Sequence, residues 1–189
     1  YSSTDIPPAV ANYPTVDEIL QTVSPAQINN VKAHVIAQKA IADAQGCRLD
    51  CYEAGQHFVG LYAAVNDDTL TNILISANRD SRMYNRYIEY LNMLKANGVD
   101  MCGNFSFIYS PSKWGSWGVL EYQDQPIDSA PKYRALINWI NAKSQGDFDS
   151  NGYVDLNDLK AFSNQWLTPG PDADLNKSAI VDFRDFVLF

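Results

Sequence analysis

A twelve-residue run near the C-terminus, from Asp147 to Asp158, carries oxygen-bearing side chains at fixed intervals. Positions 1, 3, 5, 9 and 12 of the run are Asp, Asp, Asn, Asp and Asp, position 6 is Gly152 and position 8 is Val154. A hard cation such as calcium needs six or more converging oxygens, and a glycine permits the sharp turn that wraps the chain round the ion. The spacing predicts a calcium loop in preference to a surface turn rich in Asp, Asn and Gly.

The same pattern returns at residues 174–185. In the first loop the expected ligands are the side chains of Asp147, Asp149 and Asn151, the carbonyl of Tyr153, and then Asp155 and Asp158. In the second loop they are Asp174, Asn176, Ser178, Ile180, Asp182 and Asp185. The second loop has a neutral Ser at position 5, Lys177 beside it, and Ala179 in place of the glycine. Because a left-handed alanine costs about 1 kcal/mol or more, we expect the second site to be weaker than the first, or empty.

Between the loops, Leu159, Phe162 and Trp166 follow the spacing of a short amphipathic helix, and a Pro-Gly-Pro sequence ends it. The result is two loop-then-helix units, neither with an incoming helix. This organisation resembles a dockerin, the duplicated EF-hand type module of secreted polysaccharide-degrading enzymes. The resemblance covers residues 146–189, and we assign a small all-α module with calcium loops to 144–189, cut within its second helix. It implies that calcium folds the module and that its helices dock onto a cohesin-like partner.

The first 143 residues show alternating helical and strand-like patterns. Helical periodicity begins at Ile28 and ends at Gly46, and it returns from Asp80 to Gly98 and again from Pro131. Strand-like runs lie between these segments, at residues 47–52 and 101–109. This order predicts a parallel α/β sheet flanked by helices. Two strands are too few to close such a sheet, so we expect further strands upstream.

The candidate chemistry lies where the two strands end, because side chains at the carboxyl ends of parallel strands converge. Glu53 ends the first strand, with Tyr52, Gln56 and His57 beside it, and the loop after the second strand carries Trp114 and Trp117. Aromatic faces flanked by glycines suit sugars, whose rings present apolar C–H faces. A carbohydrate site is therefore predicted. The alternatives are that Glu53 is a surface or salt-bridged acid and that one tryptophan fills the core.

The sequence Tyr-Glu-Ala-Gly-Gln-His at 52–57 and the sequence Trp-Gly-Ser-Trp-Gly at 114–118 resemble the final quarter of a secreted (β/α)8-barrel glycoside hydrolase. The resemblance covers about residues 15–142 and is strengthened by the dockerin-like tail. It implies an α/β fold that is the C-terminal, incomplete portion of a (β/α)8 (TIM) barrel, spanning residues 1–143. It also implies that Glu53 is the nucleophile of a retaining enzyme whose acid/base lies upstream of Tyr1. We therefore expect this chain to be a fragment that does not hydrolyse glycans alone.

Composition excludes several classes of protein. The chain has 189 residues, with 22 acidic and 14 basic side chains and a net charge of −8. This balance argues against a nucleic-acid partner. Runs without charge, such as residues 101–112, are too short to cross a membrane. We expect a secreted or cell-surface protein whose partner is a polysaccharide or oligosaccharide.

Several alternatives stay open at this stage. The chain is either part of an enzyme or a non-catalytic glycan-binding or scaffold-anchoring protein whose activity is calcium-dependent docking, and a calcium-regulated enzyme on another α/β fold is a third reading. Glu121 is interpreted as a solvated loop acid in preference to a residue that contacts the sugar. The three cysteines, Cys47, Cys51 and Cys102, are interpreted as buried thiols in preference to zinc ligands. In a secreted protein, a disulfide to Cys102 is the alternative.

Overall fold

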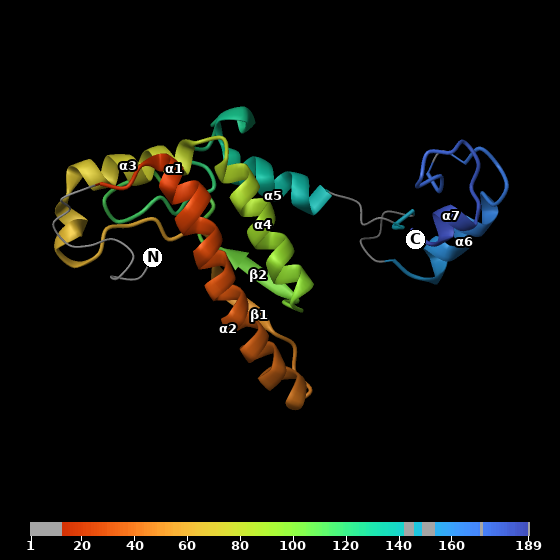
Figure 1. Cartoon of the computed structure of the whole chain (residues 1–189). Helices are drawn as coiled ribbons and strands as arrows, with labels where there is room; N and C mark the ends of the chain where they lie inside the picture. The colour runs from red at the N-terminus through yellow and green to blue at the C-terminus, as the bar shows by residue number, and fades with distance from the viewer. Residues whose placement is uncertain (1–12, 142–145, 149–153, 171, 189) are drawn as a thin grey trace. The chain divides into compact units, whose positions relative to one another are not determined.

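The computed structural model describes residues 13–141, 146–148, 154–170 and 172–188. The chain divides into two compact units, Tyr1–Ile140 and Asn141–Phe189 (Figure 1). The larger unit is of the α/β class, with two parallel strands among the described residues and helices packed against them.

The described part of the larger unit follows the order helix, strand, helices, strand, helix. Its elements are α1 (Val16–Glu18), a π-helical turn (Ile19–Val23), α2 (Ser24–Ala44), β1 (Asp50–Ala54), a 3-10 turn (Tyr62–Asn66), α3 (Asp68–Arg79), α4 (Met83–Ala96), β2 (Met101–Asn104), a second 3-10 turn (Ile127–Ser129) and α5 (Pro131–Asn141). The predicted helices correspond to α2, α4 and α5. The sequence analysis missed α3, whose first turn is capped by Asp67, the acceptor of the Leu70 N–H at 2.9 Å.

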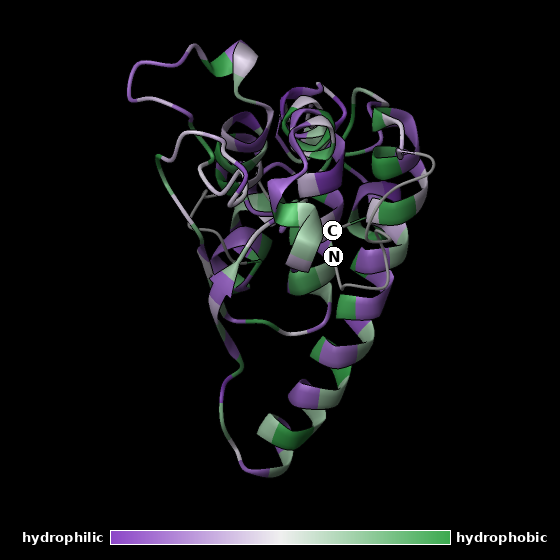
Figure 2. Cartoon of the chain, turned by 90° about the vertical axis from the view of Figure 1, so that its left-hand side faces the viewer, coloured by the Kyte–Doolittle hydropathy of each residue, from purple (hydrophilic) through white to green (hydrophobic). Residues whose placement is uncertain are grey.

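Left-handed glycines end two of these helices where the sequence predicted it. Gly46 follows α2 with φ +66°, and Gly98 follows α4 with φ +76°. Along α2, polar and apolar residues alternate over most of its length (Figure 2), and Ile36 and Ile41 are exposed. Among its described residues, α2 buries only Ser24 and Val35. The apolar periodicity of the sequence had predicted a larger buried face for this helix.

The strands β1 and β2 pair in parallel, with Cys51 opposite Cys102 and Ala54 opposite Asn104. An irregularity in register lies between Cys51 and Ala54. α2 and α4 run beside this pair (Figure 1), and Val35 and Leu94 pack with residues of both strands in one apolar cluster. A larger cluster, containing Leu20, Leu70, Met83 and Tyr87, joins α3 and α4 to the chain before α2.

The second strand is shorter than the predicted run of residues 101–109. Its pairing with β1 ends where the Phe105 N–H donates to the Ala54 carbonyl at 2.8 Å. From Ser106 on, the backbone hydrogen bonds go to a different segment: Ser106 N–H donates to Trp117 O, and Leu120 N–H donates to Phe107 O, both at 3.0 Å. Residues 101–105 therefore bond to β1 and residues 106–109 to the segment 117–120. The periodicity of the sequence does not encode which segment pairs with which.

The smaller unit contains two described helices, α6 (Leu156–Asn164) and α7 (Phe183–Phe186). Phe162, Ala173 and Val181 form its buried core, with Phe148 and Trp166 packed against them. Both helices start in the same way. The side chains of Asp155 and Asp182 each accept a backbone N–H in the first turn, and the Asp three residues later accepts the N–H of the cap.

Candidate functional site

Glu53 is the next-to-last residue of β1 and is exposed to solvent. The chain turns directly after it at Gly55, which has φ +133°. A Cβ at this position would lie 3.2 Å from the Phe105 carbonyl and 3.3 Å from the Tyr87 hydroxyl. The absence of a side chain at residue 55 thus lets the end of β1 approach the end of β2 and α4 closely.

A cavity of about 370 Å³ opens beside Glu53. It is lined by Glu53, Ala54, Gly55, Gln56, His57, Phe105 and Trp117. The His57 and Trp117 rings lie 4.7 Å apart between centroids at 34°, and Phe105 meets Trp117 edge-on at 5.9 Å. Burial lowers the pKa of His57, which favours its neutral form at neutral pH. The cavity thus combines one carboxylate with an aromatic wall.

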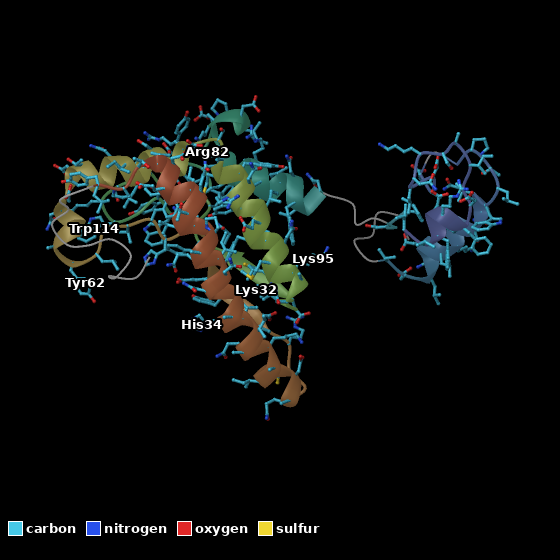
Figure 3. All side chains as sticks on the ribbon, in the orientation of Figure 1. Lys32, His34, Tyr62, Arg82, Lys95 and Trp114 are labelled. Carbon is cyan, nitrogen blue, oxygen red and sulfur yellow. The ribbon has the colours of Figure 1, made fainter. Side chains whose placement is uncertain are left out.

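The two predicted tryptophans do not share one position. Trp117 lines the cavity beside Glu53, whereas Trp114 is exposed and does not line it. The Lys113 ammonium lies over the Trp114 ring at 4.9 Å from its centroid and donates to the Asn66 side chain at 2.9 Å. In Figure 3 the Trp114 label lies at the α3 side of the unit.

The glycines of the tryptophan loop are used for internal packing. A Cβ on Gly115 would lie 2.5 Å from the Trp117 ring, and a Cβ on Gly118 would lie 2.2 Å from the Leu120 carbonyl. Gly115 also has φ +126°. The loop therefore needs these glycines for its own fold. At Gly115 the group that packs closely against the backbone is the Trp117 ring, where the sequence had predicted a sugar.

Gln56 joins the site to the rest of the unit. Its Oε1 accepts the Phe58 N–H at 2.5 Å, and its Nε2 donates to the Ser116 carbonyl and, at 3.4 Å, to Asn78 Oδ1. Its backbone N–H donates to the Tyr87 hydroxyl at 3.3 Å. The Gln56 amide is thus engaged within the protein, and it links the end of β1 to α3 and to the tryptophan loop.

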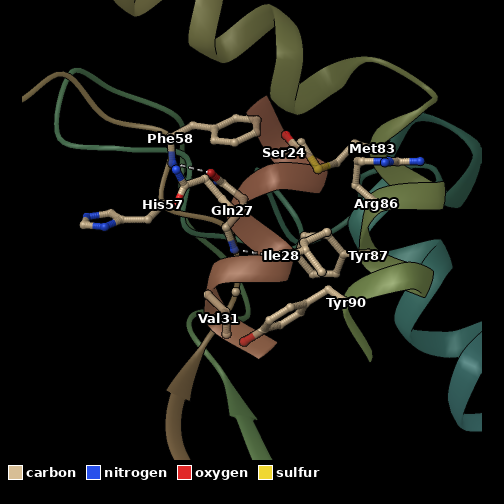
Figure 4. A pocket seen from close by; sticks show the side chains of 12 residues that line it. Ser24, Gln27, Ile28, Val31, His57, Phe58, Met83, Arg86, Tyr87 and Tyr90 are labelled. Atoms are coloured by element: carbon tan, nitrogen blue, oxygen red, sulfur yellow. Dashed lines mark hydrogen bonds between the residues drawn. The ribbon is translucent and has the colours of Figure 1, made fainter. Parts of the chain in front are cut away.

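Tyr52 lies outside this cavity. It is 93% exposed and is not among the lining residues. A second cavity, of about 160 Å³, lies between α2 and α4 (Figure 4) and shares Gly55, Gln56 and His57 with the first. Its lining combines tyrosines and apolar side chains with polar residues that include Gln27 and Arg86, and His57 points away from Tyr87 and Tyr90 in this view. Burial raises the pKa of Tyr90 to about 12.

A buried lysine, which no sequence pattern had indicated as functional, donates a hydrogen bond to the tryptophan loop. Lys132, in the first turn of α5, is 2% exposed, and its Nζ donates to the Ser116 carbonyl at 2.5 Å. Desolvation lowers its pKa to about 7, and the charge of Glu121 opposes this shift. Its spacing of three and four residues from Ala135 and Leu136, which pack in the main core, is the sequence signal that places it on the buried face.

Glu121 is not the solvated acid that we expected. Its two carboxylate oxygens accept from Arg79 Nε and Nη2, both at 2.8 Å, and its side chain is 13% exposed. This bidentate pair holds the end of α3 against the segment after the tryptophan loop. Glu121 does not line the cavity beside Glu53.

Only part of the first predicted calcium loop lies among the described residues. Asp149, Asn151 and Tyr153 fall outside them. Asp147 and Asp158 are buried. Asp158 Oδ1 accepts the Phe148 N–H at 2.6 Å, and its Oδ2 accepts the Asp155 N–H at 2.9 Å.

The second predicted loop is described throughout. Asp174 accepts the N–H groups of Ser178 and Ala179 at 2.9 and 2.8 Å, and the Ser178 hydroxyl donates to the Ile180 carbonyl at 3.0 Å. Asp185 accepts the N–H groups of Asn176 and Asp182, both at 2.9 Å. Ala179 has φ +74°, the left-handed conformation that the loop pattern requires at this position. Within the described ranges, no group of three or more His, Cys, Asp or Glu side chains is arranged to hold a metal ion.

No protein-family model, curated protein or solved structure matches the chain. Among the described residues, no helix combines the length and the apolar composition that crossing a membrane would require.

The buried Lys132 generates a prediction about pH. Its pKa is lower in the folded protein than in the unfolded chain, so between about pH 7 and pH 10 the unfolded chain binds the extra proton. The free energy of unfolding should therefore rise with pH across this window, by at most about 1.4 kcal/mol per pH unit. Urea denaturation at pH 7, 8 and 9, followed by circular dichroism, measures this rise, and Lys132→Met should reduce its slope. An equal slope in both proteins would contradict the assignment.

Proposed function

We propose that this chain is the C-terminal part of a retaining, polysaccharide-degrading glycoside hydrolase, with Glu53 as its nucleophile and a dockerin-like calcium module at residues 144–189. The observation that carries the proposal is the cavity beside Glu53, where a carboxylate at the end of a parallel strand adjoins the rings of His57, Phe105 and Trp117. A sugar bound there would stack an apolar ring face on an aromatic side chain and present its anomeric carbon to Glu53.

The position of Glu53 supports a nucleophilic role. It is solvent-accessible, at the carboxyl end of a parallel strand, where catalytic residues of (β/α)8 barrels gather. The described residues place no salt-bridge partner on it within 4.0 Å. A carboxylate exposed in a cavity can reach a substrate, whereas one held by an arginine, as Glu121 is, cannot do so without breaking that pair.

Retaining hydrolysis needs a second carboxyl group about 5 Å from the nucleophile, to protonate the leaving oxygen. Among the described residues that line the cavity, Glu53 is the only acid. In the proposed enzyme the acid/base is therefore supplied by a strand outside this chain. The parallel pairing of β1 and β2, with helices beside it, is consistent with one sector of such a barrel.

The same observation favours a second candidate function. A cavity with one carboxylate and an aromatic wall can bind a glycan without cleaving it, and the protein would then anchor a glycan through the larger unit and a protein partner through the calcium module. The two candidates differ in whether Glu53 is needed for turnover or only for binding.

Calcium is the proposed cofactor of the smaller unit. Its two helices share one cap geometry, and the left-handed Ala179 stands where the first loop has Gly152. Apolar side chains at equivalent positions of the two repeats are exposed, namely Leu156 with Phe183 and Leu159 with Phe186. These paired apolar residues support the proposal that a cohesin-like partner covers them, as the dockerin resemblance implies, in a secreted or cell-surface setting.

Binding of oligosaccharide to the chain itself tests the sugar site. Tryptophan fluorescence, titrated with a panel of β- and α-linked oligosaccharides, should respond to at least one of them because Trp117 lines the cavity. Trp117→Leu should remove the response, and Trp114→Leu, the matched control, should keep it. A response lost in Trp114→Leu and kept in Trp117→Leu would move the binding site away from Glu53.

Turnover tests the role of Glu53 in an enzyme that contains this chain and a second carboxylate. Glu53→Gln should lower kcat by several orders of magnitude and leave sugar affinity nearly unchanged, because the amide cannot form the glycosyl intermediate. Asp124→Asn, an exposed control near the tryptophan loop, should keep full activity. If Glu53→Gln retains more than about a tenth of the activity, the glycan-binding alternative gains and the nucleophile assignment fails.

Calorimetric titration with calcium tests the smaller unit. Asp147→Ala should remove most of the binding heat, since the first loop has the better ligand set and the glycine at its turn. Asp174→Ala should remove a smaller part, and Asp172→Asn, outside both loops, should leave the heat unchanged. A larger loss in Asp174→Ala than in Asp147→Ala would reverse the order of the two sites.

A further inference from the structure

Two of the three cysteines face each other across the parallel strands below the candidate sugar site. Cys51 of β1 and Cys102 of β2 are direct partners in the register of the sheet. Both side chains are half-buried, in the cluster that α2 and α4 form over the strands.

Backbone hydrogen bonds on both sides hold this pair at strand spacing. Before it, the Asp100 N–H donates to the Leu49 carbonyl at 2.9 Å, and after it the Phe105 N–H donates to the Ala54 carbonyl at 2.8 Å. Paired strands lie about 4.7–4.9 Å apart, which falls within the Cα separation of about 4.4–6.8 Å that a disulfide spans. The register of the sheet is therefore compatible with a bond between the two sulfurs.

The third cysteine is placed differently. Cys47 precedes β1, is exposed, and its thiol donates to the Gln45 carbonyl at 3.6 Å. The strand-like run predicted from the sequence, residues 47–52, includes both Cys47 and Cys51. In the structure β1 starts at Asp50, so only Cys51 lies on the strand.

We propose that Cys51 and Cys102 form a cross-strand disulfide in an oxidising environment, and that Cys47 remains a free thiol. The proposal does not depend on the proposed function. Its structural consequence concerns the site, because Cys51 lies two residues before Glu53 and Cys102 lies three residues before Phe105. The bond would join β1 and β2 at their second residues, on the strands that lead to Glu53 and to Phe105.

Oxidation requires a two-electron acceptor, and a small-molecule disulfide such as oxidised glutathione supplies it. The Cys51 thiolate attacks one glutathione sulfur, which forms a mixed disulfide and releases one glutathione thiolate. The Cys102 thiolate then attacks the Cys51 sulfur and releases the second glutathione, so that two protein thiols lose two protons and two electrons. Burial, with a contribution from Cys51, raises the pKa of Cys102 to about 11, so only a small fraction of Cys102 is thiolate at neutral pH.

Mass spectrometry of the full chain tests the pairing. After equilibration with oxidised and reduced glutathione, the remaining thiols are alkylated and the protein is digested without reduction. The wild type should carry one alkyl group, on Cys47, and should yield a linked peptide pair containing Cys51 and Cys102. Cys47→Ser should form the same link and carry no alkyl group. A link from Cys47 to either strand cysteine, or three alkylated thiols under fully oxidising conditions, would overturn the proposal.

Thermal unfolding provides a second readout that does not depend on peptide recovery. In the Cys47→Ser background, the oxidised protein should melt about 5–10 °C above the reduced protein, since the bond joins residues far apart in the chain. Cys51→Ala and Cys102→Ala, each combined with Cys47→Ser, should melt at the same temperature under oxidising and reducing conditions. A melting temperature of Cys47→Ser that is unchanged or lowered by oxidation would contradict a disulfide that fits the native sheet.

Discussion

The Ser116 carbonyl is the point on which the geometry of the site depends. It accepts from Gln56, two residues after β1, and from Lys132, in the first turn of α5. The Gln56 side chain also reaches Asn78 of α3 and the Phe58 backbone. Because buried polar groups must be hydrogen-bonded, these contacts specify where the tryptophan loop sits, and Trp117 follows Ser116 directly. The distance between the aromatic wall and Glu53 is thus set by Gln56, which lines the cavity, together with Lys132 and Asn78, which do not.

Charge near this point is held in two different ways. Arg79 and Glu121 form a two-pronged ion pair, and the hydrogen bonds to Glu121 raise the pKa of Arg79. The Lys132 ammonium donates to the Ser116 carbonyl and interacts with the charge of Glu121. Its burial makes the charged form of the lysine costly. The tryptophan loop is therefore flanked by an ion pair on one side and by a buried lysine with a lowered pKa on the other.

The smaller unit shows how a repeated sequence produces repeated local structure. In both repeats the last Asp of the twelve-residue pattern accepts the N–H of the helix cap and a second N–H from the start of the loop. These contacts close each loop on its own helix. The first loop meets the requirement for a left-handed residue with glycine in its sequence, and the second meets it with Ala179 at φ +74°. Loop geometry therefore tolerates a residue that is locally unfavourable when the surrounding hydrogen bonds demand it.

Local patterns in the sequence determined the helices α2, α4 and α5, the glycines that end two of them, and the α/β class, because periodicity and caps act over a few residues. They also singled out Glu53, Trp117 and His57, which the structure places on one cavity. Only the tertiary structure decided that Trp114 lies elsewhere, that Glu121 pairs with Arg79, that residues 106–109 bond to the tryptophan loop, and that Cys51 is the partner of Cys102. Each of these results depends on which distant segment supplies the nearest partner, and the spacing of residues along the chain carries no such information.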